Sequence, residues 1–228
     1  MNIVLIPCIK SESRNLGANY EDFDSLSHAA INTYFSAIKH ISDADEVIVF
    51  HVKCSNSIQE VERKILSKML ELNSKGNNVL LLEADTLCVR DFDCSEFPRN
   101  KLQLFTLIGM SDFPEEIGKD YYLNSGVIWF PYKASRKIRK SISFFLSEPW
   151  PNRWAYYQLI WNLLYYGQFK NRDRGLSQVL GLGSGKFNWI IDDAPYKVDE
   201  SSSKIMHFFT SRGIKRVVEL QNIHKSNS

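Results

Sequence analysis

Apolar residues in the first half of this chain form short runs that alternate with two longer periodic segments. The runs at 3–6, 46–52 and 79–82 are too short for helices and predict buried strands. Segments 24–41 and 58–72 carry apolar side chains at helical spacing, and Gly76 is expected to end the second helix. This order of strand, helix, strand, helix, strand predicts parallel pairing and an α/β fold.

Later segments are less regular. Residues 102–108 and 205–209 predict two further strands, and 187–191 a short one. Residues 121–130 are expected to form a polar turn, at Asn124 to Gly126, followed by an apolar strand that Pro131 ends. Helices are expected from about Ala134 to Phe145 and over about 152–166, and residues 181–185 are expected to form a loop.

No repeat or linker interrupts the sequence, which favours one domain over 1–220 and a polar tail over 221–228. The 228 residues are 44% hydrophobic and 24% charged, as in an ordinary globular protein. A net charge of +2 gives no reason to expect a nucleic-acid partner. There is no apolar run of membrane-spanning length and no basic leader, and the four cysteines form no CxxC pair. These features favour free thiols and a cytoplasmic location.

An acidic pair, Glu83 and Asp85, follows directly on the apolar run 79–82. A carboxylate at the end of a buried strand requires a compensating charge, and a divalent cation such as Mg²⁺ or Mn²⁺ is one such partner. In open parallel sheets, ligands bind beyond the carboxyl ends of the strands. The polar segment after the first strand, 10–17, is expected at the same edge. An acidic residue leaving a strand into solvent is the simpler alternative.

Two further features have the chemistry of a ligand site. Gly126 would let the backbone approach a ligand closely, and Asn124 can hydrogen-bond a group rich in hydroxyls. His207 lies on a predicted strand and offers an imidazole that suits Mn²⁺, with Arg212 and Lys215 following as cations for a phosphate. Each feature also has a purely structural explanation, as a tight turn or a core histidine.

Taken together, these motifs resemble the GT-A nucleotide-sugar glycosyltransferases. The features shared with the family are an apolar strand ending in [DE]-x-D, the element Tyr122-Leu123-Asn124-Ser125-Gly126-Val127, and a late His207-Phe208 followed by basic residues. The order is most similar to the retaining group that includes glycogenin and the bacterial lipopolysaccharide galactosyl- and glucosyltransferases.

The resemblance implies a single-domain GT-A fold, Rossmann-like, with a mixed, mainly parallel sheet flanked by helices. It also implies hexosyl transfer from a nucleotide-diphosphate-sugar to a glycan or glycolipid acceptor, as in polysaccharide biosynthesis. Base, sugar, acceptor, stereochemistry and oligomeric state stay open.

The resemblance also assigns roles to individual residues. It implies that Glu83, Asp85 and His207 hold Mn²⁺ or Mg²⁺, with Asp85 next to the diphosphate. It implies a donor-binding set spread along the chain: Pro7, Lys10, Arg14, Glu83, Asn124, Ser125, Arg212 and Lys215. Asp85 and Asn124 are expected in catalysis. An inverting reaction would also need a general base, for which the candidates are Asp112, Asp173, Asp192 and Asp193.

The sequence departs from the family at Glu83, where Asp is usual, and over 207–215, where the family's glycine and lysine are displaced. Two other functions stay open. A sugar nucleotidyltransferase would carry a Gly-rich basic signature after the first strand, which residues 7–10 lack. A non-catalytic nucleotide- or glycan-binding module is the other.

The basic helix at 133–140 suggests peripheral contact with an anionic membrane or an acidic glycan, and an ordinary solvated face is the alternative.

Overall fold

A computed structural model describes residues 1–11, 23–54, 58–108, 121–134, 136–150, 158–162, 180–183, 189–191 and 204–208. The first half alternates strands and helices: β1 (Asn2–Ser11), α1 (Phe23–His40), β2 (Glu46–Cys54), α2 (Ile58–Ser74) and β3 (Asn78–Leu82). Next come β4 (Thr86–Cys88), a 3₁₀ turn η1 (Cys94–Glu96), β5 (Leu102–Ile108) and β6 (Tyr121–Phe130). Then follow α4 (Arg136–Ser147), β7 (Leu180–Gly183), β8 (Trp189–Ile191) and β9 (Ile205–Phe208).

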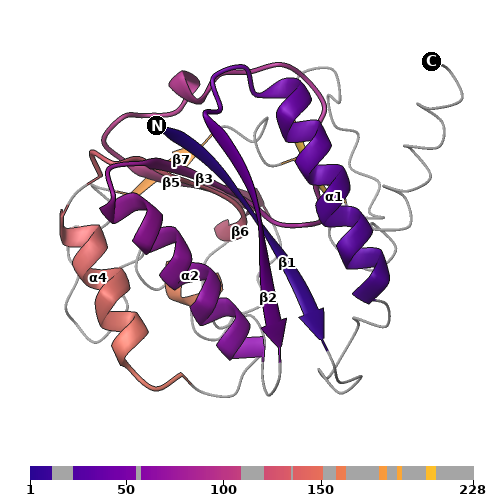
Figure 1. Ribbon diagram of the computed structural model, residues 1–228. Helices are drawn as coiled ribbons and strands as arrows, with labels where there is room; N and C mark the ends of the chain where they lie inside the picture. Colours follow the sequence, from indigo (N-terminus) through magenta and orange to yellow (C-terminus); the bar gives the residue numbers. More distant parts are fainter. Residues whose placement is uncertain are drawn as a thin grey trace, which may run out of the picture.

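Six of the described strands form one sheet in the order β2-β1-β3-β6-β5-β7. The pairs β1–β2, β1–β3 and β5–β7 are parallel, and β6 runs antiparallel to both of its neighbours. Helices α2 and α4 cover one face of this sheet and α1 covers the other (Figure 1). The predicted mixed, mainly parallel sheet flanked by helices is confirmed.

The core has two halves, one on each face of the sheet. Alternate residues of β1 point to opposite sides: Ile3 and Leu5 pack with α2 and α4, whereas Val4 and Ile6 pack with α1. Strand β3 divides its side chains in the same way. Because both faces are covered, these strands are apolar at every position, which is the pattern visible in the sequence.

A second, smaller sheet has the order β4-β9-β8. Strand β4 pairs antiparallel with β9, and Thr86 lies opposite His207 in this register. Helix α1 also packs on β4. The small sheet therefore joins the end of β3 to a strand that is more than a hundred residues further along the chain.

Three sequence predictions about local structure are wrong. The sequence predicts a first strand over 2–9 whose hydrogen bonding ends at Pro7, but β1 pairs with β2 through Pro7 and continues to Ser11. Among the described strands, β1 pairs only with β2 beyond Leu5, so its other side tolerates a residue without an N–H. Asn124 to Gly126 form no turn; they lie inside β6, whose register with β5 shifts between Gln103 and Phe105. Residues 180–183, expected as a loop, form β7 beside β5.

The end of α2 and the described thiols agree with the sequence predictions. Gly76 adopts a φ of +96°, which closes the chain after α2 as predicted. Cys8, Cys88 and Cys94 are buried free thiols, as expected, and Cys54 has no described side chain. In the part of the chain that is described, no helix is long and apolar enough to cross a bilayer. The predicted tail 221–228 lies outside the described residues.

Candidate functional site

Glu83 and Asp85 lie in a short turn between β3 and β4, at the carboxyl edge of the main sheet. The backbone N–H of Glu83 donates to the carbonyl of Gly126 at 2.8 Å, so pairing with β6 continues one residue past β3. The turn is then closed by Thr86, whose N–H and hydroxyl donate to the carbonyl of Glu83 at 3.0 and 2.7 Å. This fixes the backbone on both sides of Asp85.

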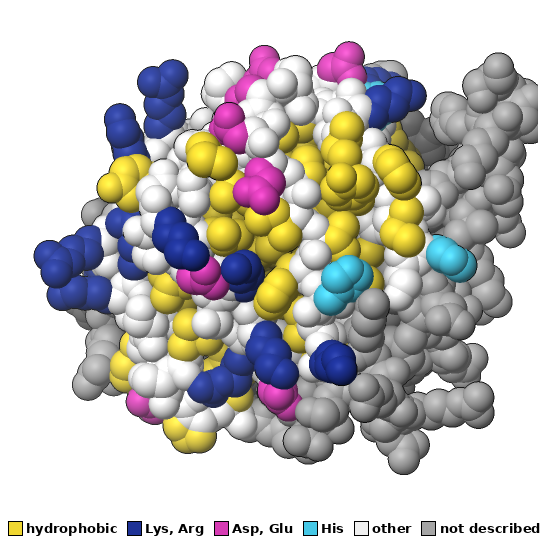
Figure 2. Space-filling model, viewed as in Figure 1, with side chains coloured by type: hydrophobic (Ala, Val, Ile, Leu, Met, Phe, Trp, Pro, Cys, Tyr) yellow, Lys and Arg dark blue, Asp and Glu magenta, His cyan; other side chains and the backbone are white. Residues whose placement is uncertain are grey.

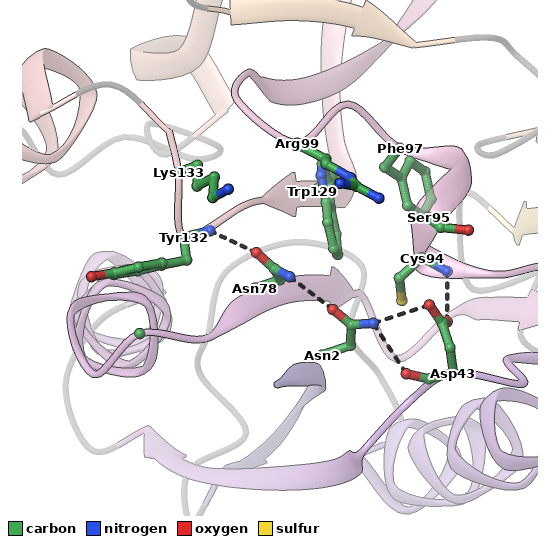
Figure 3. A pocket seen from close by; sticks show the side chains of 11 residues that line it. Asn2, Asp43, Asn78, Cys94, Ser95, Phe97, Arg99, Trp129, Tyr132 and Lys133 are labelled. Carbon is green, nitrogen blue, oxygen red and sulfur yellow. Dashed lines mark hydrogen bonds between the residues drawn. The ribbon is translucent and has the colours of Figure 1, made fainter.

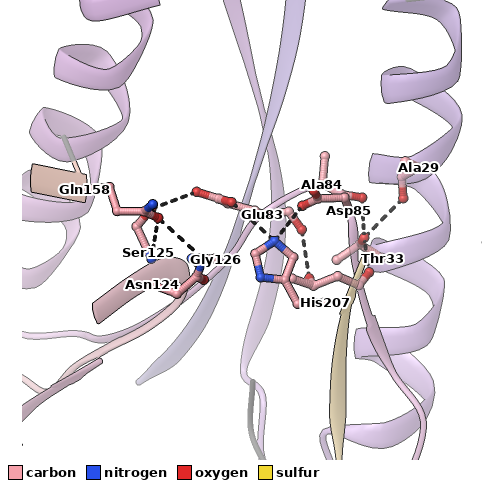
Figure 4. A network of polar contacts seen from close by, with 11 residues as sticks. Ala29, Thr33, Glu83, Ala84, Asp85, Asn124, Ser125, Gly126, Gln158 and His207 are labelled. Atoms are coloured by element: carbon pink, nitrogen blue, oxygen red, sulfur yellow. Dashed lines mark hydrogen bonds and ion pairs between the residues drawn. The ribbon is translucent and has the colours of Figure 1, made fainter. Parts of the chain in front are cut away.

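Strand β9 brings His207 to these carboxylates. Its Nε2 lies 3.3 Å from Oδ1 of Asp85 and 3.6 Å from Oε2 of Glu83 (Figure 4). One potential ligand atom from each of the three residues lies within 4.8 Å of the other two. The three residues predicted to hold a metal, Glu83, Asp85 and His207, therefore lie together, although His207 is far from the two carboxylates in the sequence.

Gly126 leaves the space in which the His207 ring lies. A Cβ on Gly126 would overlap Cε1 and Nδ1 of that imidazole and would stand 2.9 Å from Oδ1 of Asn124. Any side chain at this position must therefore displace the imidazole. The glycine was expected to admit a ligand to the backbone, but what it admits is the histidine of the same site.

Asn124 and Ser125 form a buried polar network with Gln158, which lies in a helical segment at 158–162. Oε1 of Gln158 accepts from the Ser125 N–H at 3.1 Å and lies 3.4 Å from Nδ2 of Asn124. The Ser125 hydroxyl lies 2.9 Å from that oxygen and 3.2 Å from Oε1 of Glu83. Its single hydrogen can go to one of them at a time. The network thereby links β6 to the carboxylate of Glu83.

Thr33 supports the same turn from the other side. Its side chain is fully buried on α1, and Oγ1 lies 2.8 Å from the carbonyl of Ala84 and 2.5 Å from that of Thr86. Both carbonyls flank Asp85 in the chain. Helix α1 therefore holds the carboxylate-bearing turn through one hydroxyl group.

The electrostatics of the three side chains are strongly coupled. Burial, and then the negative charge of Asp85, raise the pKa of Glu83 from 4.5 to about 7. Burial lowers the pKa of His207, but the neighbouring Asp85 and Glu83 carboxylates outweigh it, so the net shift is upward. Two carboxylates that repel each other beside an imidazole favour a bound cation.

The ligand atoms of Glu83, Asp85 and His207 suit a hard divalent ion. His207 is 1% exposed, whereas the side chains of Glu83 and Asp85 are 36% and 22% exposed, so the group opens to solvent through its carboxylates. Two carboxylates and one imidazole suit Mn²⁺ or Mg²⁺, with water or a phosphate oxygen completing the shell.

The remaining predicted site residues lie on β1 or outside the described residues. Pro7 and Lys10 lie in the part of β1 that extends past the end of its pairing with β3, at the edge that carries the carboxylates, although the Lys10 side chain is not described. Seven predicted residues lie outside the described residues: Arg14, Asp112, Asp173, Asp192, Asp193, Arg212 and Lys215.

Sequence reasoning did not place Gln158 or Thr33 at the site. The sequence does carry a signal for Gln158, because it is a polar residue in a helix that is otherwise apolar nearly all round. Thr33 shares the buried face of its helix with Ala30 and Ala37, and a hydroxyl on an apolar face needs a hydrogen-bond partner, which is the signal for it.

A cavity of about 320 Å³ lies at the opposite edge of the sheet, where β1 and β3 begin. On its wall Asn2 forms hydrogen bonds with both Asn78 and Asp43, and Arg99 and Lys133 also line it (Figure 3). It is separate from the carboxylates and imidazole described above.

No protein-family model and no curated protein matches the sequence. Solved structures do match. A glycosyltransferase involved in the glycosylation of the major capsid of PBCV-1 overlays with a TM-score of 0.58 at 14% identity, covering 95% of this chain and 98% of that one. This overlay shows that the chain shares the fold of that protein, which is consistent with the GT-A fold predicted from the motifs.

Two structures of the galactosyltransferase LgtC overlay more loosely. One, in complex with donor and acceptor sugar analogs, gives a TM-score of 0.46 at 14% identity and covers 96% of this chain and 95% of that one. The other, an active-site mutant, gives 0.49 at 15% identity, with coverages of 97% and 95%. Overlays this loose support no conclusion about this chain.

Proposed function

We propose that this chain is a metal-dependent glycosyltransferase that moves a hexose from a nucleotide-diphosphate-sugar to a hydroxyl of a glycan or glycolipid. The observation that carries the proposal is the convergence of Glu83, Asp85 and His207 at the carboxyl edge of a GT-A sheet. That edge is where open α/β sheets bind their ligands. The fold alone would not support the assignment, because one fold serves many functions.

In this proposal Glu83, Asp85 and His207 hold Mn²⁺ or Mg²⁺, which when bound neutralises charge on the donor diphosphate as a Lewis acid. Nε2 of His207 lies closer to Asp85, at 3.3 Å, than to Glu83, at 3.6 Å. Thr33 fixes the turn that carries Asp85, and Gln158 fixes the strand segment opposite it. The site is thus preorganised by groups that do not need to contact the substrate.

Donor binding is proposed for residues around this edge. Pro7 and Lys10 would contact the base and ribose, and Asn124 and Ser125 would face the donor sugar. The proposal further assigns base and ribose contact to Arg14, the diphosphate to Arg212 and Lys215, and general-base chemistry to Asp192 if the reaction inverts. The leaving nucleoside diphosphate carries the developing charge, so positioning and electrostatic stabilisation supply most of the catalysis.

The test is release of nucleoside diphosphate from a panel of nucleotide-sugars, with Mn²⁺ or with EDTA. We expect turnover of one donor that requires the ion and is lost in Asp85→Asn. Metal-dependent binding of the donor without turnover would instead indicate a binding module. Turnover of a sugar phosphate with a nucleoside triphosphate would indicate a nucleotidyltransferase.

The membrane contact predicted from the basic helix is part of this proposal. Lys133, Arg136, Lys137 and Lys140 are exposed on the outer side of α4 and its preceding turn, whereas Ile138 points into the core. Each cation near an anionic lipid surface contributes about 1 kcal/mol. Co-sedimentation with phosphatidylserine vesicles should therefore weaken steeply in a Lys137→Glu, Lys140→Glu double variant, and equal binding of both proteins would contradict the contact.

A further inference from the structure

Helix α1 carries an apolar stripe on the side that faces away from the core. Ile31, Phe35 and Ile38 are 46%, 63% and 51% exposed, and their spacing of four and three residues places them on one face. The opposite face is fully buried through Ala30, Thr33 and Ala37. A solvent-facing helix surface is normally polar, so this helix has two apolar sides and only one of them is covered.

The stripe is also poor in charge. Apart from two histidines, the eighteen residues of α1 include a single acid, Asp24, and a single base, Lys39, near its two ends. A helix that meets water usually carries alternating charges on its outer face. The pattern is that of a helix with a partner. Helix α1 offers too few cations to attract an anionic lipid surface.

Strand β2 lies beside this helix and forms one edge of the main sheet. Within the described residues β2 pairs only with β1, so the N–H and C=O groups of its outer side have no neighbouring strand. Val47 and Val49 of β2 are half-buried in the same cluster as Tyr34 of α1, whose ring lies 5.4 Å from that of Phe35. Tyr34 thus connects the stripe to the strand edge.

We name the surface made by these side chains the α1–β2 face; it comprises Ile31, Tyr34, Phe35, Ile38, Val47 and Val49. Figure 2 shows hydrophobic side chains gathered over α1 and along β2 in this view. An exposed sheet edge next to an exposed apolar stripe is a surface that proteins usually protect or use.

We propose that the α1–β2 face binds a second copy of this chain, forming a twofold dimer through antiparallel pairing of the two β2 strands. With Val49 on the twofold axis, residues 46–52 of each strand pair with one another and the two sheets become continuous. The same axis brings the two α1 helices together on one face of that sheet, where their apolar stripes meet. The α1–β2 face of one copy is thereby complementary to the same face of the other copy, as a twofold interface requires.

Charge complementarity supports the second copy over another partner. Strand β2 begins at the acidic residues Asp45 and Glu46 and ends near Lys53, all of them exposed. Antiparallel pairing about Val49 places Asp45 opposite Lys53 of the other copy, and this contact occurs twice. A parallel arrangement would place like charges together. Lys64 reaches the carbonyl of Lys53 at 3.4 Å, which limits the pairing to the residues before it.

Sedimentation velocity of the full chain tests the proposal, at concentrations from about 1 to 100 µM. The wild-type protein should sediment as a species of twice the 26.4 kDa chain mass. A Phe35→Glu, Ile38→Glu double variant places two charges in the dimer interface and should raise the dissociation constant at least about a hundredfold. Tyr132→Glu is the matched control: its side chain is 49% exposed outside the α1–β2 face, and the variant should remain dimeric.

Charge exchange tests the antiparallel pairing itself. Lys53→Glu creates two clusters of like charge with Asp45 and should weaken the dimer about tenfold, while Asp45→Lys combined with Lys53→Glu should recover most of that loss. Circular dichroism and thermal unfolding of each variant exclude misfolding as the cause. A wild-type protein that is monomeric at every concentration overturns the proposal. So does a dimer that is indifferent to the Phe35 and Ile38 substitutions, or a double charge variant no better than Lys53→Glu.

Discussion

Replacing Glu83 with Gln should stabilise the metal-free protein while removing its metal binding. Folding raises the pKa of Glu83 from 4.5 to about 7, first through burial and then through the charge of Asp85. The folded protein therefore holds this proton more tightly than the unfolded chain. Between these two pKa values the unfolded chain has lost the proton and the folded protein keeps it, so stability falls as the pH rises.

The magnitude follows from the two pKa values. A difference between about 7 and 4.5 corresponds to about 3 kcal/mol at 1.36 kcal/mol per pH unit. The Glu83 side chain is 36% exposed, so water screens part of this effect, and we expect about 1–2 kcal/mol. Gln is close in size to Glu and its Oε1 can still accept from the Ser125 hydroxyl, so the substitution removes the charge without opening a cavity.

Urea unfolding in EDTA measures the effect. At about pH 8 the Glu83→Gln variant should be more stable than the wild-type protein by about 1–2 kcal/mol, and near pH 5 the difference should fall to about a quarter of that. Glu71→Gln is the matched control with the opposite sign. The Lys75 and Lys68 ammonium groups hold the pKa of Glu71 below its usual value, so its loss should not stabilise the protein.

Two results would refute this reasoning. One is a Gln variant that is no more stable than the wild-type protein at about pH 8 in EDTA. The other is a stability gain that stays constant between about pH 8 and pH 5, since a gain unrelated to the Glu83 charge would not depend on its titration. Adding Mn²⁺ should reverse the order of stability, because only the wild-type protein gains binding energy from the ion.

Three further substitutions or modifications test parts of the site and core. Gly126→Ala should displace the His207 imidazole, destabilise the protein by about 1–3 kcal/mol and weaken Mn²⁺ binding more than tenfold, measured by urea unfolding and metal titration. Thr33→Val should cost about 1–3 kcal/mol and weaken Mn²⁺ binding, and full affinity would contradict its positioning role. Cys88 and Cys94 should react with a thiol reagent only on unfolding, since burial raises the pKa of Cys88 to about 12 and that of Cys94 further; rapid labelling of the folded protein, located by mass spectrometry, would contradict this.

The sequence predicted the central strands and their flanking helices because buried positions are occupied by apolar residues. Strands β1 and β3 are covered on both faces, so every position of 3–6 and 79–82 is apolar. The element containing Asn124 and Ser125 was read as a turn because its polar residues looked solvent-exposed. Both side chains are buried, and Gln158 and Glu83 satisfy them from other parts of the chain. Local sequence does not show such distant partners.

The grouping of Glu83, Asp85 and His207 was predicted from motifs, and its geometry depends on a strand that the sequence did not reveal. Strand β4 has three residues, too few for a periodic pattern, yet its pairing with β9 places His207 beside Asp85. The glycines of β7 suggested a loop, because glycine has no side chain that favours a strand. Pairing with the neighbouring β5 nevertheless makes this segment a strand. Contacts between residues so far apart in sequence are fixed by the fold.

Mn²⁺ titration followed by electron paramagnetic resonance tests the central claim most directly, because the ion in free solution gives a sharp signal that is lost on binding. We expect one Mn²⁺ per wild-type chain, bound more tightly in the presence of one nucleoside diphosphate, and no such site in Asp85→Asn. A wild-type chain that binds no ion with any nucleoside diphosphate would contradict the proposed site, as would an Asp85→Asn variant with unchanged binding.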